Sequence, residues 1–146
     1  MVMTSEDLLN SSPAELDALY RQAPIGPIPD GVAEGHVLFI ADTPVNRLIT
    51  SSVNALAWQG KVFFRDKGYL LNLVSAFRLR LVKATLSRGE SWFCPREEAI
   101  ILDYSKTSFL AQKIRDEIRQ VAPGLFIGQA YWDDHRVLSF SLQFPT

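Results

Sequence analysis

The chain has 146 residues, a length typical of one domain of ordinary size. Its composition, 47% hydrophobic and 21% charged, excludes a mostly disordered chain. The formal net charge of −1 creates no broad basic field, so we expect no nucleic acid partner.

The cysteine content and the apolar runs indicate the cellular compartment of the protein. Cys94 is the single cysteine, so the chain forms no intramolecular disulfide, as suits a reducing compartment. The first residues lack the basic and apolar stretches of a signal peptide, and the longest apolar runs are far shorter than the roughly 20 residues of a spanning helix. We therefore expect a cytoplasmic protein without integral membrane association. The oligomeric state is left open.

The N-terminal third predicts two helices and one strand. Ser12, Pro13 and Glu15 form a helix start, and that helix should end near Arg21. A proline-rich arm follows, and we expect residues 1–31 to pack on the sheet of one domain that spans residues 1–146. A strand is predicted over Val32–Ala41, and a second helix from Thr43 to near Trp58.

The middle of the chain predicts tight-turned strands. Lys61–Arg65 and Tyr69–Val74 flank a three-residue loop that ends in glycine, as in many hairpins. Leu79–Ser87 and Ser91–Phe93 are predicted to form a second hairpin. Ala99–Tyr104 is almost continuously apolar, which is typical of a buried strand.

The C-terminal part predicts a long helix and a final hairpin. Apolar residues at helical spacing, opposite a charged face, predict a helix over Thr107–Val121. Leu125–Trp132 and Arg136–Phe144 flank a short polar turn, and the second arm alternates strictly between apolar and polar residues. Gly128 and Ala130 leave room on one face of the first arm for a helix or a ligand.

These elements predict an α+β fold. We expect a curved antiparallel sheet, or a small half-open β-barrel, of seven to eight strands flanked by three helices. A flat sheet with all helices on one side is the alternative.

Few side chains suggest a chemistry. Asp103 ends a buried strand, and with Tyr104 and Lys106 it is our candidate for general acid–base catalysis. The ordinary alternative is that Asp103 braces the following turn. Cys94 has no evident base beside it, and two histidines with one cysteine offer no zinc-ligand spacing, so we expect no metal and no cofactor.

Aromatic and basic side chains suggest a binding site. Aromatic residues on the strands could line a pocket or simply fill a core. The basic residues of the segment 78–83 could hold a polar group of a ligand, or could protect an edge strand from pairing. Our candidate ligand-binding residues are Trp58, Phe63, Arg78, Arg80, Trp92, Tyr131 and Phe140.

Several stretches resemble a family of uncharacterised bacterial proteins of similar length. They include Trp58–Phe63, Ile100–Ser108, Ile114–Arg119 and Pro123–Gly128. The resemblance implies no activity and no catalytic residues. The order of tight-turned strands is also loosely similar to lipocalin-like barrels, although the Gly-x-Trp of that family near the first strand is absent.

Three functions are compatible with these observations. The first is binding of a small apolar or amphipathic molecule, such as a fatty acid or an isoprenoid, inside the sheet or barrel. The second is a cofactor-independent enzyme, isomerase-like or cyclase-like, that acts on such a ligand. The third is a protein-interaction module that docks through the N-terminal arm.

Overall fold

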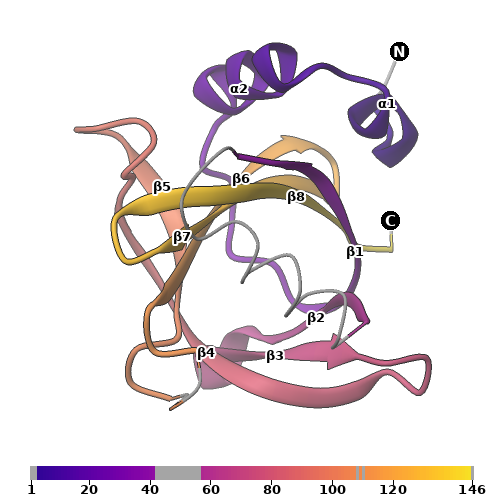
Figure 1. The fold of residues 1–146 in the computed structure, drawn as a ribbon, viewed down its shortest axis with the longest axis vertical. Coiled ribbons are helices and arrows are strands. Elements are labelled where there is room, and N and C mark those ends of the chain that lie inside the picture. The colour runs from indigo at the N-terminus through magenta and orange to yellow at the C-terminus, as the bar shows by residue number, and fades with distance from the viewer. Residues whose placement is uncertain (1–2, 42–56, 108, 110, 146) are drawn as a thin grey trace.

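The computed structural model, described over residues 3–41, 57–107, 109 and 111–145, is a closed antiparallel β-barrel of eight strands. Figure 1 shows the barrel with two short helices at one side. The elements are α1 (Ser5–Leu9), α2 (Pro13–Gln22), β1 (Gly31–Ile40), β2 (Trp58–Phe64), η1 (Arg65–Lys67), β3 (Tyr69–Val74), β4 (Leu79–Glu90), β5 (Glu98–Asp103), β6 (Ile114–Ala122), β7 (Leu125–Trp132) and β8 (His135–Gln143).

The barrel is closed rather than half-open. Each strand pairs antiparallel with the next, and β1 pairs with both β2 and β8. Closure satisfies the strand edges that an open sheet would expose. It also argues against the edge-strand interpretation of the basic segment 78–83, because β4 pairs with β3 and β5.

The described residues contain two α-helices, not the three that we predicted. The helix expected from the Ser12 and Pro13 signal is α2, where the Ser12 side chain accepts from the Glu15 amide. The short helix α1, capped by Thr4, was not predicted. The helix predicted from Thr43 falls almost wholly on residues 42–56, outside the described residues, and Trp58 begins β2.

The helix predicted over Thr107–Val121 is wrong, because its C-terminal part is the strand β6. Ile114 and Ile118 are four residues apart, which suits one helix face but equally suits one face of a strand. Asp116 lies midway between the two isoleucines on the same face of the strand, and it is buried. Glu117 and Arg119 are also buried, so a large part of the charged face that suggested a solvated helix is covered.

The hairpin predicted around Arg88 is also wrong. β4 continues in register through Gly89 and Glu90 against β5, and the turn comes later, where the Ser91 amide donates to the carbonyl of Glu97. Gly89 is read in the sequence as a turn residue, yet here it lies opposite Ala99 within a strand pair. The other two predicted hairpins are confirmed as β2–β3 and β7–β8.

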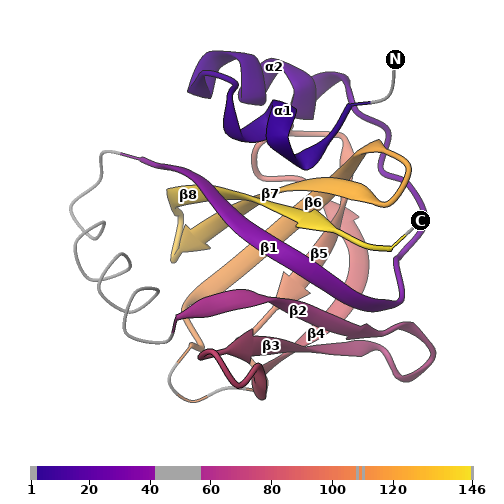
Figure 2. The same cartoon turned by 90° about the vertical axis from the view of Figure 1, so that its right-hand side faces the viewer.

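The N-terminal segment contacts the barrel in two places. The helices α1 and α2 lie over its outer surface (Figure 2), where Leu8, Leu16 and Tyr20 form an apolar cluster with Leu125 and Ile127 of β7. The proline-rich arm then crosses one end of the barrel. Its carbonyls at Pro24, Gly26 and Ile28 accept hydrogen bonds from Gln120, Arg88 and Arg65, which belong to or follow three different strands.

The two ends of the barrel therefore differ. We call the end crossed by residues 23–30 the arm end, and the opposite end, where β2 begins, the Trp58 end. Because consecutive strands run antiparallel, the β3–β4 turn and the segment between β5 and β6 also lie at the Trp58 end.

Side chains fill much of the barrel interior. Phe144 makes edge-to-face contacts with Phe63 and Phe126, and Phe140 makes one with Trp58. The Phe140 ring occupies the space beside Gly128, where an added Cβ would lie 2.1 Å from a ring carbon. Gly128 on β7 therefore leaves room for the Phe140 ring.

In the described part of the chain, every helix is too short or too polar to cross a lipid bilayer.

Candidate functional site

A buried lysine forms the centre of a polar cluster inside the barrel. Lys61 of β2 is 3% exposed. Its Nζ donates to Asn72 Oδ1 at 2.7 Å and to Tyr104 Oη at 2.7 Å, and it lies 3.2 Å from Asp116 Oδ2. An ammonium group has three N–H donors, so these three oxygens satisfy all of them.

Asn72 of β3 holds the lysine from one side. Its Oδ1 also accepts from Trp58 Nε1 at 3.1 Å, and its Nδ2 donates to Tyr104 Oη at 2.8 Å and to the Val82 carbonyl at 2.9 Å. The amide therefore uses all its donors. Lys61 and Asn72 lie directly opposite each other in the β2–β3 pairing, so their side chains lie on the same face of the sheet. That face is the inner one, because both side chains are buried in the interior cluster.

A backbone irregularity in β4 completes this contact. The β3–β4 register shifts between Leu71 and Asn72, and Val82 has a φ of 58°. A left-handed φ is unfavourable for a β-branched residue. The bulged Val82 supplies the carbonyl that accepts from Asn72, which ties the strained position directly to the cluster.

Asp116 of β6 is the acidic member of the cluster. Only 6% of its side chain is exposed. Oδ2 faces Lys61, whereas Oδ1 is buried and has no hydrogen-bond partner within the described part of the chain. Buried polar atoms are usually paired, so an unpaired carboxylate oxygen requires an explanation.

Aromatic rings enclose the lysine. Its Nζ lies 5.5 Å from the Trp58 ring centroid and 5.4 Å from the centroids of Tyr104 and Phe140. These distances are within the range of cation–π attraction, which is stronger where water is excluded. The rings and the three oxygens therefore stabilise a charged lysine in the interior.

Burial changes the acid–base properties of the cluster. Desolvation raises the pKa of Asp116, against the opposing effects of Lys61 and of the hydrogen bond from Tyr104. Desolvation also raises the pKa of Tyr104. Burial by itself would lower the pKa of Lys61, but the oxygens of Tyr104 and Asp116 outweigh it, and the net direction is upward. Acid–base groups with shifted pKa values in one place are typical of functional sites.

The predicted catalytic residues are separated. Tyr104 is buried in the cluster, between Lys61 and Asn72. Asp103 is half-buried and accepts from the Ser105 amide at 2.9 Å, which is the turn-bracing contact. Lys106 is exposed on the following turn.

The predicted ligand-binding residues divide into three groups. Trp58 and Phe140 enclose Lys61, and Phe63 packs deeper in the interior core. Arg78 and Arg80 are exposed near the β3–β4 turn. Trp92 and Tyr131 form an edge-to-face pair with centroids 5.1 Å apart beside the Arg115 side chain, away from the interior cluster.

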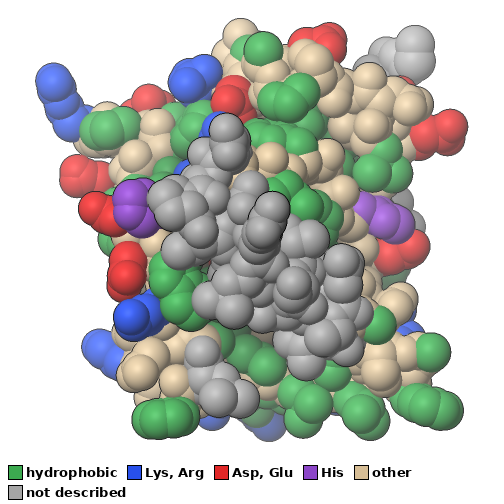
Figure 3. Space-filling view, in the orientation of Figure 1, with side chains coloured by type: hydrophobic (Ala, Val, Ile, Leu, Met, Phe, Trp, Pro, Cys, Tyr) green, Lys and Arg blue, Asp and Glu red, His purple; other side chains and the backbone are tan. Residues whose placement is uncertain are grey.

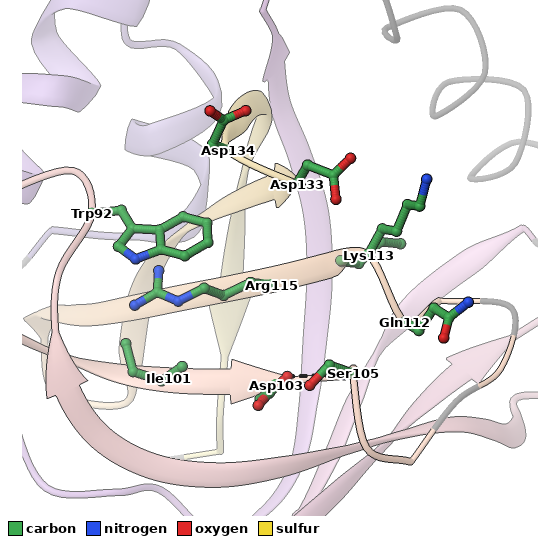
Figure 4. A pocket seen from close by; sticks show the side chains of 10 residues that line it. Trp92, Ile101, Asp103, Ser105, Gln112, Lys113, Arg115, Asp133 and Asp134 are labelled. Atoms are coloured by element: carbon green, nitrogen blue, oxygen red, sulfur yellow. Dashed lines mark hydrogen bonds between the residues drawn. The ribbon is translucent and has the colours of Figure 1, made fainter.

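Trp92 of that aromatic pair borders a separate cleft on the outer surface of the barrel. The cleft has a volume of about 700 Å³, and Figure 4 shows the Trp92 indole beside the Arg115 guanidinium. Two of its charged groups, Arg115 and Asp103, already have hydrogen-bond partners within the protein. Arg115 donates to Glu117 and to the carbonyl of Glu90, and Asp103 accepts from Ser105. We therefore favour the interior cluster as the functional site.

Sequence reasoning missed Lys61, Asn72 and Asp116. Each lies at an inward-facing position of a strand, where apolar residues such as Phe63, Leu70 and Ile118 are its alternating neighbours. The available signal was a polar residue among the otherwise apolar inward-facing positions of a strand. For Asp116 that signal was hidden, because its strand had been predicted as a helix.

Comparisons with known proteins support the fold alone. No family model matches the sequence, and no curated protein matches it. A crystal structure of a protein from Thermomonospora curvata superposes with a TM-score of 0.66 at 18% identity, covering 93% of this chain and 89% of that chain. At this identity the likeness concerns the barrel architecture, so the family resemblance noted in the sequence stays a prediction.

Proposed function

We propose that the barrel binds a small amphipathic molecule whose polar end meets Asp116. The observation that carries this proposal is the unpaired, buried Oδ1 of Asp116, beside a lysine whose three donors are all occupied. An eight-stranded barrel is just wide enough for its side chains to fill it or for one small ligand. The aromatic side chains around the cluster supply apolar contacts for such a ligand.

The free atom determines which polar group is favoured. Oδ1 is an acceptor, and the N–H groups of Lys61 and Asn72 already have acceptors. The ligand must therefore bring a donor, such as a hydroxyl or an amine. A ligand carboxylate would meet the Asp116 carboxylate with a like charge. Among the ligand classes we considered, an isoprenoid alcohol is favoured over a fatty acid anion.

Trp58 is the side chain that we expect to move on binding. It is the first residue of β2, it is only half-buried, and its indole makes one hydrogen bond, to Asn72. The β1 backbone at Gly35 lies directly under the ring, because an added Cβ there would come within 2.4 Å of it. Rotation of the indole away from Gly35 and Phe140 would open interior space next to Lys61.

Titration with farnesol, an isoprenoid alcohol, tests the proposal. The variant Lys61→Met/Asp116→Leu replaces the buried ion pair with apolar side chains of similar size, which often preserves stability. A matched control is Asp17→Leu/Arg136→Met, which removes an ion pair of 2.8 Å on the outer side of the barrel. We expect calorimetric binding to the natural chain and to the control, and at least tenfold weaker binding to the interior variant.

Native mass spectrometry of protein purified gently from its own host complements the titration. A retained molecule with a hydroxyl or amine group would support the proposal. Equal farnesol affinity of the interior variant and the control would contradict it, and so would binding of palmitate in preference to farnesol.

A second candidate, a cofactor-independent isomerase-like or cyclase-like enzyme, is favoured by the hydrogen bond of Lys61 Nζ to Tyr104 Oη, because the same Nζ lies 3.2 Å from Asp116 Oδ2. Tyr104 could donate a proton to a bound ligand while Asp116 accepts one. In that case Tyr104→Phe should abolish turnover without weakening binding, whereas Asp103→Asn should leave turnover unchanged. We place either function in the cytoplasm, because the single cysteine is a free, buried thiol.

A further inference from the structure

The β3–β4 hairpin exposes apolar side chains at the Trp58 end of the barrel. Phe77, in the turn, is 86% exposed, and Leu79 and Leu81 at the start of β4 are 52% and 48% exposed. Figure 3 shows hydrophobic side chains along the lower right edge of the molecule, where Figure 1 places this hairpin. Single exposed apolar residues are common, but three within five positions of one hairpin form a patch.

The same hairpin is strongly basic. Residues 67–89 contain five cationic side chains and no acidic one, although the whole chain has a net charge of −1. Arg78, Arg80 and Lys83 alternate with the exposed apolar residues, and none of the three forms an ion pair within the described ranges. We call Phe77, Arg78, Leu79, Arg80, Leu81 and Lys83 the hairpin patch.

We propose that the hairpin patch docks the barrel onto an anionic lipid bilayer, with the Phe77 side chain inserted at the interface. Cationic side chains near an anionic membrane surface contribute about 1 kcal/mol each, and apolar side chains add the free energy of leaving water. Long basic side chains can keep their charge among the headgroups while neighbouring apolar residues enter the acyl region.

The composition of the patch favours lipid over nucleic acid. Two of its exposed apolar residues are leucines, which do not stack on bases as aromatic rings do. The aromatic rings nearby are already occupied, because Arg80 lies 5.9 Å from the Phe64 ring centroid and Lys83 lies 4.1 Å from that of Tyr69. Docking in this orientation would turn the Trp58 end toward the membrane. The inference stands on the patch alone and does not depend on the proposed ligand.

Flotation of the full chain with lipid vesicles tests this inference. Vesicles of equal parts phosphatidylglycerol and phosphatidylcholine are compared with vesicles of phosphatidylcholine alone. The test variants are Phe77→Ser, Arg80→Gln and the pair Arg78→Gln/Arg80→Gln. The matched controls are Leu9→Ser, which removes an apolar residue of α1 that is 48% exposed, and Arg96→Gln, which removes a cation from the exposed turn after Cys94.

We expect binding to the anionic vesicles only. From about 1 kcal/mol per cation, each lost arginine of the patch should weaken partitioning about fivefold. Phe77→Ser should weaken it at least as much, and the controls should bind like the natural chain. Equal losses in patch and control variants would overturn the proposal. Failure to float with anionic vesicles would also overturn it, as would tighter binding to a polyuridine strand than to the vesicles.

Discussion

Asp116 and Glu117 are adjacent carboxylates on β6 that face opposite sides of the barrel wall. Both are buried, at 4% and 0% exposure. Glu117, on the outside, is fully paired. Its Oε2 accepts from Tyr20 Oη at 2.6 Å and from the Ser91 hydroxyl, and its Oε1 accepts from the Trp92 amide and from Arg115.

The inner carboxylate differs in one respect. Asp116 has its ion pair with Lys61, but Oδ1 has no partner in the described chain. The Glu117 contacts tie α2 and the segment after β4 to the barrel, so their role is structural. The ion pair of Asp116 joins β6 to β2 on the inner face of the barrel, at a site where one acceptor has no partner among the described residues. Pairing, rather than burial, distinguishes the outer carboxylate from the one that we propose binds a ligand.

The largest expected effect comes from separating the inner ion pair. Lys61→Met leaves Asp116 buried without a counter-charge, and we expect a loss of about 3–5 kcal/mol in the free energy of unfolding. The double variant Lys61→Met/Asp116→Leu should recover most of that loss. Urea unfolding measures both. If Lys61→Met lowered the free energy of unfolding by less than about 1 kcal/mol, the ion pair would not stabilise the fold as proposed.

A smaller effect is expected at the outer carboxylate. Glu117→Gln keeps the shape but removes the charge that attracts Arg115 and the two hydroxyl donors, and we expect a loss of about 2–3 kcal/mol. Glu97→Gln is the control, because that carboxylate is 60% exposed and its ion pair with Arg119 is long, at 3.6 Å. Farnesol affinity should be unchanged in both. A weakened affinity in Glu117→Gln would remove the distinction between the two faces.

The smallest effect appears only at alkaline pH. Burial, with a contribution from Glu117, raises the pKa of Tyr131 from 10.0 to about 12. A raised pKa means that the folded state holds the proton more tightly, so this stabilisation is complete below pH 10 and is lost as the pH rises through 12. Tyr131→Phe should flatten the unfolding free energy in that window. An unchanged pH profile, or ultraviolet titration of this tyrosine near pH 10, would contradict the assignment.

Local patterns predicted the parts of the fold that depend on near neighbours. The hairpins β2–β3 and β7–β8 follow from alternation and turn residues, and α2 follows from its capping serine and proline. Closure of the barrel depends on pairing between β1 and β8, which are about 100 residues apart in the chain, and no local pattern specifies that pairing.

The candidate site was only partly predictable for the same reason. Tyr104 was recognised as a possible catalytic residue, but its partners were expected to be its chain neighbours Asp103 and Lys106. The partners in the structure come from β2, β3 and β6, and Asp116 became inward-facing only because Ile114–Ala122 is a strand. Helical and strand spacing both fit the two isoleucines of that segment, so the sequence could not distinguish them.

A crystal structure of the protein with farnesol bound would test the central claim most directly. The account predicts that the hydroxyl oxygen lies at hydrogen-bond distance, about 2.6–3.0 Å, from Asp116 Oδ1, with the Trp58 indole displaced from Gly35. Farnesol bound in the outer cleft beside Trp92 and Arg115, with Trp58 unmoved and Asp116 Oδ1 still without a partner, would contradict it.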